Sequence, residues 1–194
     1  MKNLLIAFIM LMLYGCSKEI PPISTSPIES IPGYIKYTIL KGQHYCDKST
    51  IKSFSKSQLN FKVKFDSSAI YESVITENQY DINKLHGFSE GINHHQNSAR
   101  IGWSWNKKAL RLYAYVYSDS TRIMKEITTV PIGPEISCSI GISGSRYVFS
   151  INEATLGIER KIKGAPIAGY WLYPYFGGDE VAPHDVSIYI LESE

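Results

Sequence analysis

The stretch "ARIGWSWNKKALRLYAYVYS", residues 99–118, has the pattern of a β-hairpin. Two runs of aromatic, aliphatic and small side chains flank the polar segment "NKKA", residues 106–109, which is short enough for a hairpin loop. Because successive side chains of a strand point to opposite faces, the second run has an aliphatic face and an aromatic face. We expect the aliphatic face to pack against a second sheet. The aliphatic face holds Leu112, Ala114 and Val116, and the aromatic face holds Arg111, Tyr113, Tyr115 and Tyr117.

The aromatic side chains of this hairpin are the predicted ligand-binding surface. In the first run Ile101, Trp103 and Trp105 share one face, opposite Gly102 and Ser104. Flat rings stack on the C–H faces of sugars, while phenol and guanidinium groups form hydrogen bonds with hydroxyls. The alternative is that these rings pack under long loops as a second small core. The predicted binding residues are Trp103, Trp105, Arg111, Tyr113, Tyr115 and Tyr117.

The rest of the chain after residue 33 repeats the pattern of strands and turns. Apolar and polar residues alternate in runs such as "LNFKVKFD", residues 59–66, and "DVSIYILE", residues 185–192, and glycines such as Gly177 and Gly178 mark turns between them. No stretch has the period of a long amphipathic helix. The chain has 194 residues, of which 44% are hydrophobic, enough for one domain with a core. Many strands without helices predict an all-β fold, an antiparallel two-sheet β-sandwich of the jelly-roll type, over residues 34–194.

The first 33 residues carry targeting signals and are excluded from the fold. Lys2 precedes the apolar run "LLIAFIMLML", residues 4–13, which is long enough for a signal peptide and too short for a comfortable membrane span. It ends in "LYGC", which resembles a bacterial lipobox, so we expect residues 1–15 to be a lipoprotein signal peptide and Cys16 to carry lipid. Residues 16–33 are rich in Pro and Ser, as in a tether. This predicts a lipid-anchored protein of the cell envelope, at the outer membrane on its periplasmic or surface face.

Two cysteines remain after Cys16, and two interpretations of them stay open. Cys46 and Cys138 could pair as a disulfide in an oxidising envelope compartment. The alternative is that they are free buried thiols. Neither cysteine lies in a recognisable catalytic motif.

The segment "YDINKLHGFSEGINHHQNSAR", residues 80–100, gathers histidines and acids in a predicted loop. The adjacent pair His94 and His95 is a poor metal clamp on a strand, because neighbouring side chains point apart. The segment also lacks the H-E-x-x-H spacing of zinc proteases. Glycan cleavage by β-elimination needs a base and a cation at the uronate, and Tyr113, Tyr115, Arg111 and His94 are of the right types.

The closing stretch "WLYPYFGGDEVAPHDVSIYI", residues 171–190, is dense in charged and aromatic residues. Its carboxylates, Asp179, Glu180 and Asp185, leave a calcium site open as an alternative, although the spacing is not that of a calcium loop. Asp179 and Glu180 are adjacent and so cannot face each other as the two carboxylates of a glycosidase do. We interpret the stretch as the entry to the last strand, and we expect no cofactor.

Three quoted segments resemble a known family. The lipobox with its tether, "NKLHGFSEG…HHQNSARIGWSW" and "LYPYFGGDEVAPHD" are similar to a family of small surface lipoproteins of Bacteroidota. The ending also resembles the last strands of concanavalin A-like jelly rolls of lectins, glucanases and polysaccharide lyases. The resemblance implies this fold and a glycan-related setting. It transfers no catalytic set, because the E-x-D-x-x-E strand of family 16 glucanases and the Q-I-H and Y-x-K-A-G-x-Y motifs of family 7 alginate lyases are absent.

These observations favour one function and leave two alternatives. The formal net charge of +2 and the lack of an aromatic-basic motif argue against nucleic-acid binding. We expect a non-catalytic domain that binds glycan or another surface ligand. The alternatives are a glycan-cleaving enzyme, either a glycoside hydrolase or a polysaccharide lyase, and a component that binds a protein of an envelope complex.

Overall fold

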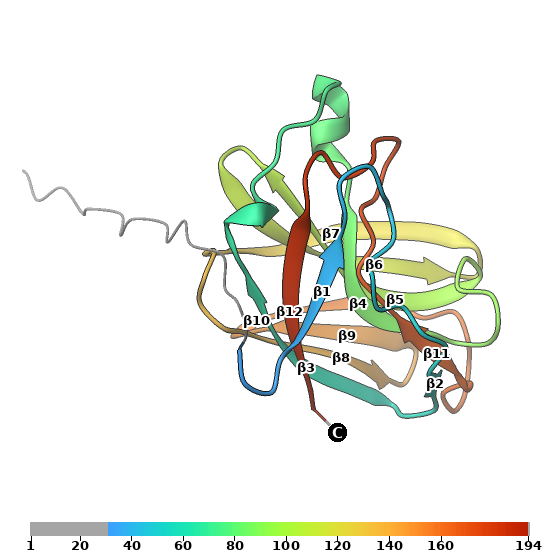
Figure 1. Cartoon of the computed structure of the whole chain (residues 1–194). Coiled ribbons are helices and arrows are strands. Elements are labelled where there is room, and N and C mark those ends of the chain that lie inside the picture. Colours follow the sequence, from blue (N-terminus) through green and yellow to red (C-terminus); the bar gives the residue numbers. More distant parts are fainter. Residues whose placement is uncertain (1–30, 194) are drawn as a thin grey trace, which may run out of the picture.

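The computed structural model describes residues 31–193 and consists of two antiparallel sheets packed face to face (Figure 1). Cys16 and the signal and tether residues up to Ser30 lie outside the described residues. Between residues 31 and 193 no helix is long and apolar enough to cross a membrane. Two short 3-10 helices, η1 (Ser67–Ala69) and η2 (Thr76–Tyr80), precede the fourth strand. The all-β, two-sheet architecture predicted from the strand pattern is confirmed.

Each sheet has six strands. In spatial order, the first sheet comprises β1 (Ile35–Ile39), β12 (Val186–Ser193), β3 (Gln58–Phe65), β8 (Ile136–Ser143), β9 (Arg146–Ile151) and β10 (Ala154–Glu159). In spatial order, the second sheet comprises β2 (Ser53–Phe54), β11 (Gly169–Leu172), β4 (Asn83–Ser89), β5 (Asn97–Asn106), β6 (Ala109–Ser118) and β7 (Thr121–Val130).

The predicted hairpin is present as β5 and β6. Its turn is tighter than "NKKA", because only Lys107 and Lys108 lie between the strands, with φ of 49° and 57°. Positive φ at both central residues is typical of a turn whose twist matches that of the strands. The turn also decides the register, which pairs Trp103 with Leu112 and Arg100 with Tyr115.

This register corrects the predicted position of the two tryptophans. Trp103 lies opposite Leu112, so both side chains enter the core between the sheets, and Trp103 is 0% exposed. Its ring lies 5.4 Å from the ring of Phe65 in the first sheet, measured between centroids. Trp105 is half-buried and packs against the same core. The prediction that Trp103 and Trp105 belong to the aromatic binding surface is therefore wrong.

Cys46 and Cys138 are buried free thiols, and they do not form the disulfide that was one of the two alternatives. Cys138 on β8 is 4% exposed, and burial raises the pKa of its thiol. The backbone of Cys46 forms an isolated antiparallel β-bridge with that of Ile39, the last residue of β1.

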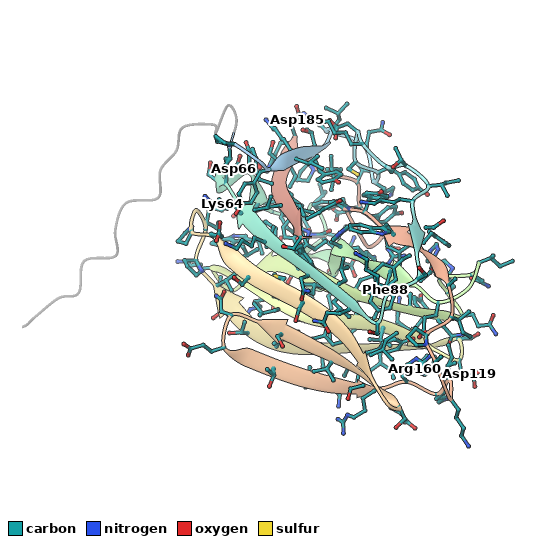
Figure 2. All side chains as sticks on the ribbon, turned by 90° about the horizontal axis from the view of Figure 1, so that it is seen from below. Lys64, Asp66, Phe88, Asp119, Arg160 and Asp185 are labelled. Carbon is teal, nitrogen blue, oxygen red and sulfur yellow. The ribbon has the colours of Figure 1, made fainter. Side chains whose placement is uncertain are left out.

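A buried ion pair fixes one end of the sandwich, the end that carries Arg160 and Asp119 in Figure 2. The Arg160 guanidinium donates two hydrogen bonds of 2.7 Å to Glu90, and Tyr147 donates a third of 2.5 Å to the same carboxylate. Burial raises the pKa of Glu90, but these hydrogen bonds outweigh burial and leave the pKa below its ordinary value. The remaining Arg160 donors bind the carbonyls of Ile162, Gly164 and Ala165, so the network holds the segment after β10 in place.

Candidate functional site

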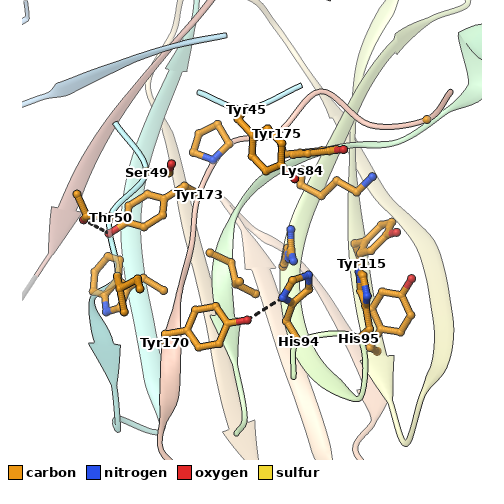
Figure 3. Close-up of a pocket in the computed structure, with 17 residues that line it drawn as sticks. Tyr45, Ser49, Thr50, Lys84, His94, His95, Tyr115, Tyr170, Tyr173 and Tyr175 are labelled. Carbon is orange, nitrogen blue, oxygen red and sulfur yellow. Dashed lines mark hydrogen bonds between the residues drawn. The ribbon is translucent and has the colours of Figure 1, made fainter. Parts of the chain in front are cut away.

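A cleft of about 540 Å³ lies over the outer face of the second sheet (Figure 3). Strands β4, β5 and β6 form its floor, and the segments 45–51 and 170–178 form a wall along one side. Its lining consists of Tyr45, Ser49, Thr50, Ile51, Lys84, His94, His95, Arg100, Tyr115, Tyr117, Tyr170, Trp171, Leu172, Tyr173, Pro174, Tyr175 and Gly178.

Arg100 is the buried cation of the cleft floor. It alternates with Ala99 and Ile101, which face the core, so its own side chain points to the outer face. It is 9% exposed, its Nε has no partner, and its guanidinium makes no hydrogen bond with any residue from 31 to 193. Burial lowers its pKa, although a guanidinium stays protonated in proteins. A buried charge without a partner is costly, so this position favours an anionic ligand.

Lys84 is the second cation of the cleft. Its Nζ lies 5.1 Å from the ring centre of Tyr115 and 5.3 Å from that of Tyr175, between the two rings in Figure 3. Burial, together with the charges of Arg100 and Arg122, lowers the pKa of Lys84 to about 8. The ammonium group is therefore still mainly protonated at pH 7.

A histidine and a tyrosine form a hydrogen-bonded pair at the other side of the cleft. His94 Nδ1 lies 2.7 Å from the hydroxyl of Tyr170 on β11, as the dashed line in Figure 3 shows. Burial, with the charges of Arg100 and His95, lowers the pKa of His94 to about 4. The imidazole is neutral at pH 7, so it can exchange a proton with the Tyr170 hydroxyl.

The wall of the cleft is aromatic and apolar. Tyr45 is 69% exposed and meets Tyr175 edge to face, with ring centres 4.9 Å apart. The hydroxyls of Thr50 and Tyr173 are 3.2 Å apart, which ties the segment 45–51 to the segment after β11. Ile51, next to Thr50, is 97% exposed. Such a wall provides ring faces and apolar contact for a ligand on the charged floor.

The structure places the predicted surface residues in three different environments. Tyr115 and Tyr117 line the cleft. Arg111 and Tyr113 lie on the same face of the sheet but outside the cleft lining, where Arg111 pairs with Glu126 at 2.8 Å and Tyr113 lies 3.0 Å from the Ser104 hydroxyl. Trp103 belongs to the core, and Trp105, which is partly buried, packs against it.

Several lining residues were not predicted from the sequence. Arg100 shares the outer face of β5 with Gly102 and Ser104, so alternation along the strand could have identified its direction. Lys84 could not be found in this way, because a β-bulge shifts the register between Lys84 and His86. Tyr170, Tyr173 and Tyr175 belong to the closing stretch that we interpreted as an architectural feature.

The acids and histidines of the two motif-like stretches are dispersed. The Glu180 carboxylate accepts hydrogen bonds of 2.8 Å from the backbone N–H groups of Val74 and Ile75, and Asp185 accepts one from Lys41. His86 is buried in the core. In the part of the chain that the structure describes, no three His, Cys, Asp or Glu residues are grouped as a metal site. Glu180 and Asp185 thus accept hydrogen bonds from different backbone segments.

The cleft lining, within residues 31–193, includes no Asp or Glu. Glycoside hydrolysis in most families needs two carboxyl groups that face each other across the bond, about 5 to 10 Å apart. The lining provides instead two cations, two histidines and several tyrosines. Its chemistry suits the binding of an acidic group, and proton transfer by imidazole or phenol, better than hydrolysis by paired carboxylates.

No protein-family model matches the chain, and no curated protein matches it in sequence. Its structure, however, matches solved structures with very different sequences. Alginate lyase AlyC3 superposes with a TM-score of 0.58 at 7% identity, over 81% of this chain and 72% of that one. LamAcat from Zobellia galactanivorans gives 0.53 at 12% identity, over 84% and 76%. Polysaccharide lyase family 18 aly-SJ02 gives 0.51 at 6% identity, over 84% and 87%.

These similarities show the fold. It is a two-sheet jelly roll. The jelly-roll prediction, and the concanavalin A-like fold implied by the resemblance, are confirmed. At these levels of identity the comparison carries no residue role from one protein to another.

Proposed function

We propose that this domain binds an acidic glycan in the cleft over the second sheet. The observation that supports the proposal most directly is Arg100, a buried cation without a partner among residues 31–193, in a cleft that lacks acids. A carboxylate of the ligand would supply the two acceptors that a guanidinium binds best.

Two further observations favour a glycan over a small anion. The cleft has the volume of a site for several sugar units or a drug-sized ligand, about 540 Å³. Its wall presents tyrosine rings, which stack on sugar C–H faces. AlyC3, which has the same fold, has been solved in complex with dimannuronate. An oligomer of mannuronate is therefore a sensible first probe.

Affinity electrophoresis and calorimetry with oligomannuronates and other polyuronates test the proposal. Arg100→Met should weaken binding at least about tenfold, since a hydrogen-bonded charge contributes about 1.5–3 kcal/mol. Arg111→Met is the matched control, because Arg111 lies on the same face but is paired with Glu126 outside the cleft. Equal losses in the two variants, or no binding of any acidic glycan by the unmodified protein, would contradict the proposal.

A second candidate, cleavage of the bound glycan by β-elimination, is favoured by the hydrogen bond between Tyr170 and His94. The hydrogen bond to the neutral His94 imidazole positions the Tyr170 hydroxyl, whose oxygen in its phenolate form can remove the C5 proton of a uronate whose carboxylate Arg100 holds. The C5–H electron pair forms the C4–C5 double bond, the C4–O bond breaks, and the leaving oxygen takes the proton from Tyr170.

The two candidates differ in one measurement. Cleavage would generate an unsaturated product that absorbs near 235 nm, and Tyr170→Phe should abolish this product while retaining binding. A protein that binds oligomannuronate without producing the absorbance is a binding domain and not a lyase.

The cellular location remains a proposal from the sequence. We propose that Cys16 is lipidated and that residues 17–33 tether the domain to the outer membrane. Cys16→Ala should move the protein from the membrane fraction to the soluble fraction of the cell, and an unchanged distribution would exclude the anchor. The alternative role, binding to an envelope protein, predicts a specific partner in a pull-down that survives Arg100→Met.

A further inference from the structure

The Gly177-Gly178 pair makes room for the side chain of Lys84. A Cβ atom at Gly177 would lie 2.3 Å from Lys84 Nζ and 2.3 Å from the carbonyl oxygen of Ile82. A Cβ atom at Gly178, whose φ is +86°, would lie 1.9 Å from the Asp81 carboxylate. The N–H of Gly177 donates to Asn83 at 2.7 Å, which holds the turn against β4. Only glycine at these positions allows the turn and Lys84 to pack this closely.

The Lys84 ammonium has no hydrogen-bonded or ionic partner among residues 31–193, although it is half-buried. Its nearest acid, Asp81, is turned to the glycine pair, where its carboxylate accepts a long hydrogen bond of 3.4 Å from the N–H of Asp179. The charged or titratable groups that face Lys84 are Asp81 before β4, Arg100 on β5, Tyr115 on β6, Arg122 on β7 and Tyr175 after β11.

Lys84 and Arg100 occupy different places on the cleft floor. Lys84 is paired with Gly102, and Arg100 is paired with Gly87. Their backbone positions thus differ by two residues along β5 and by one strand across the sheet, a separation of about 8 Å from standard sheet spacings. The two side chains start from different strands and their charges repel each other, so each cation can bind an anionic group of its own.

We propose that Lys84 is a specificity-determining residue, a second anion contact distinct from Arg100, so that the cleft selects glycans with acidic groups on neighbouring units. The Gly177-Gly178 turn positions it. This inference rests on the proposed binding of an acidic glycan and adds the requirement for a second acid.

The test compares the intact protein with Lys84→Met and with Lys64→Met by calorimetry. Lys64 is a matched control because it lies on the outer face of the first sheet, away from the cleft. The probes are a mannuronate hexasaccharide and the same hexasaccharide after partial methyl esterification. We expect Lys84→Met to bind the fully acidic probe at least about tenfold more weakly, and Lys64→Met to bind it as the intact protein does. Esterification should weaken binding by the intact protein much more than binding by Lys84→Met.

Gly177→Ala tests the positioning role. It should displace the Lys84 ammonium and weaken binding, and it should have no further effect on binding when Lys84 is already Met. Thermal unfolding of each variant shows whether it is folded under the binding conditions. Affinity of the intact protein should also fall as the pH rises through about 8, because Lys84 loses its charge. Lys84→Met, with the same tyrosines and arginines, should lack this dependence.

Unchanged binding by Lys84→Met, with loss of binding in Arg100→Met, would overturn this inference and leave the proposed function intact. Equal sensitivity to esterification in the intact protein and Lys84→Met would also overturn it, since it would mean that both cations bind one carboxylate. A failure of all acidic probes to bind would contradict both proposals.

Discussion

Arg100 and Trp103 are three residues apart on β5, and their side chains lie on opposite faces of the sheet. The Arg100 side chain points into the cleft, and the Trp103 side chain fills the core beside Phe65, Tyr71 and Phe176. A substitution at one residue should therefore change binding, and a substitution at the other should change stability.

Trp103→Ala should lower the free energy of unfolding by about 3–5 kcal/mol, because it leaves a large cavity between the sheets. Urea denaturation measures this loss. The protein that remains folded should bind oligomannuronate with unchanged affinity, whereas Tyr175→Ala, in the cleft wall, should weaken binding with a smaller loss of stability. Weaker binding of oligomannuronate by folded Trp103→Ala would contradict the assignment of Trp103 to the core alone.

His86 makes the fold sensitive to acid. It is 0% exposed, its Nδ1 lies 3.0 Å from the Leu172 carbonyl, and its Nε2 has no partner among the described residues. Burial lowers its pKa to about 4. The unfolded chain, with an ordinary histidine pKa of about 6.5, binds the proton more readily, so stability is lost as the pH falls from about 6.5 to about 4.

From His86 we expect a decrease of roughly 3 kcal/mol in the free energy of unfolding between pH 7 and pH 4, at about 1.4 kcal/mol per pKa unit. Urea denaturation at several pH values measures it. His86→Leu should remove most of this dependence, and the remainder should come from groups such as His94. If His86→Leu shows the same pH profile as the intact protein, the buried imidazole is not the cause.

At the scale of elements, the ion pair between Glu90 and Arg160 links the end of β4 to the segment that leads into β11. That segment ends beside Tyr170, so the network also supports the cleft wall. Glu90→Gln leaves Arg160 buried without its counter-charge and should cost about 3–5 kcal/mol of stability. Hydrogen exchange should show faster exchange in residues 161–168 than elsewhere.

The matched control for Glu90→Gln is Asp119→Asn. Asp119 forms an exposed ion pair of 3.9 Å with Lys161, the residue that follows Arg160 in the sequence. Exposed ion pairs contribute little to stability. Similar losses in the two variants would show that the buried network has no special role in holding the segment.

Strands could be predicted along the chain from their alternation, but a strand pairing could be predicted only where the two partners are close in sequence. The β5–β6 hairpin is a local structure, and its alternation specifies both faces once the turn is known. The cleft wall is not local, because Tyr45 forms its bridge with Tyr175 and Thr50 its hydrogen bond with Tyr173. No pattern within either segment predicts these pairings.

At the scale of the whole molecule, positive and negative charges are distributed unevenly between the cleft and the rest of the protein. The formal net charge is +2, yet the cleft contains cations and, among residues 31–193, no acid. Binding of an acidic glycan should weaken progressively from low salt to about 0.5 M, because salt screens the attraction. A neutral β-glucan should show no retardation in affinity electrophoresis at any salt concentration. Salt-independent binding, or preference for the neutral polymer, would contradict a cleft that selects by charge.

The alternation of apolar and polar residues by itself determined the fold class, because a strand must bury one face and expose the other, and it determined that Tyr115 and Tyr117 point away from the core. Which outward side chains form a site was decided only by the tertiary structure. The register of the hairpin places the Trp103 side chain in the core. The bulge in β4 allows the Lys84 side chain to point into the cleft. The closing stretch forms a cleft wall because it pairs with the distant segment 45–51. These outcomes depend on contacts between residues far apart in the sequence, such as Tyr45 and Tyr175, which local periodicity cannot encode.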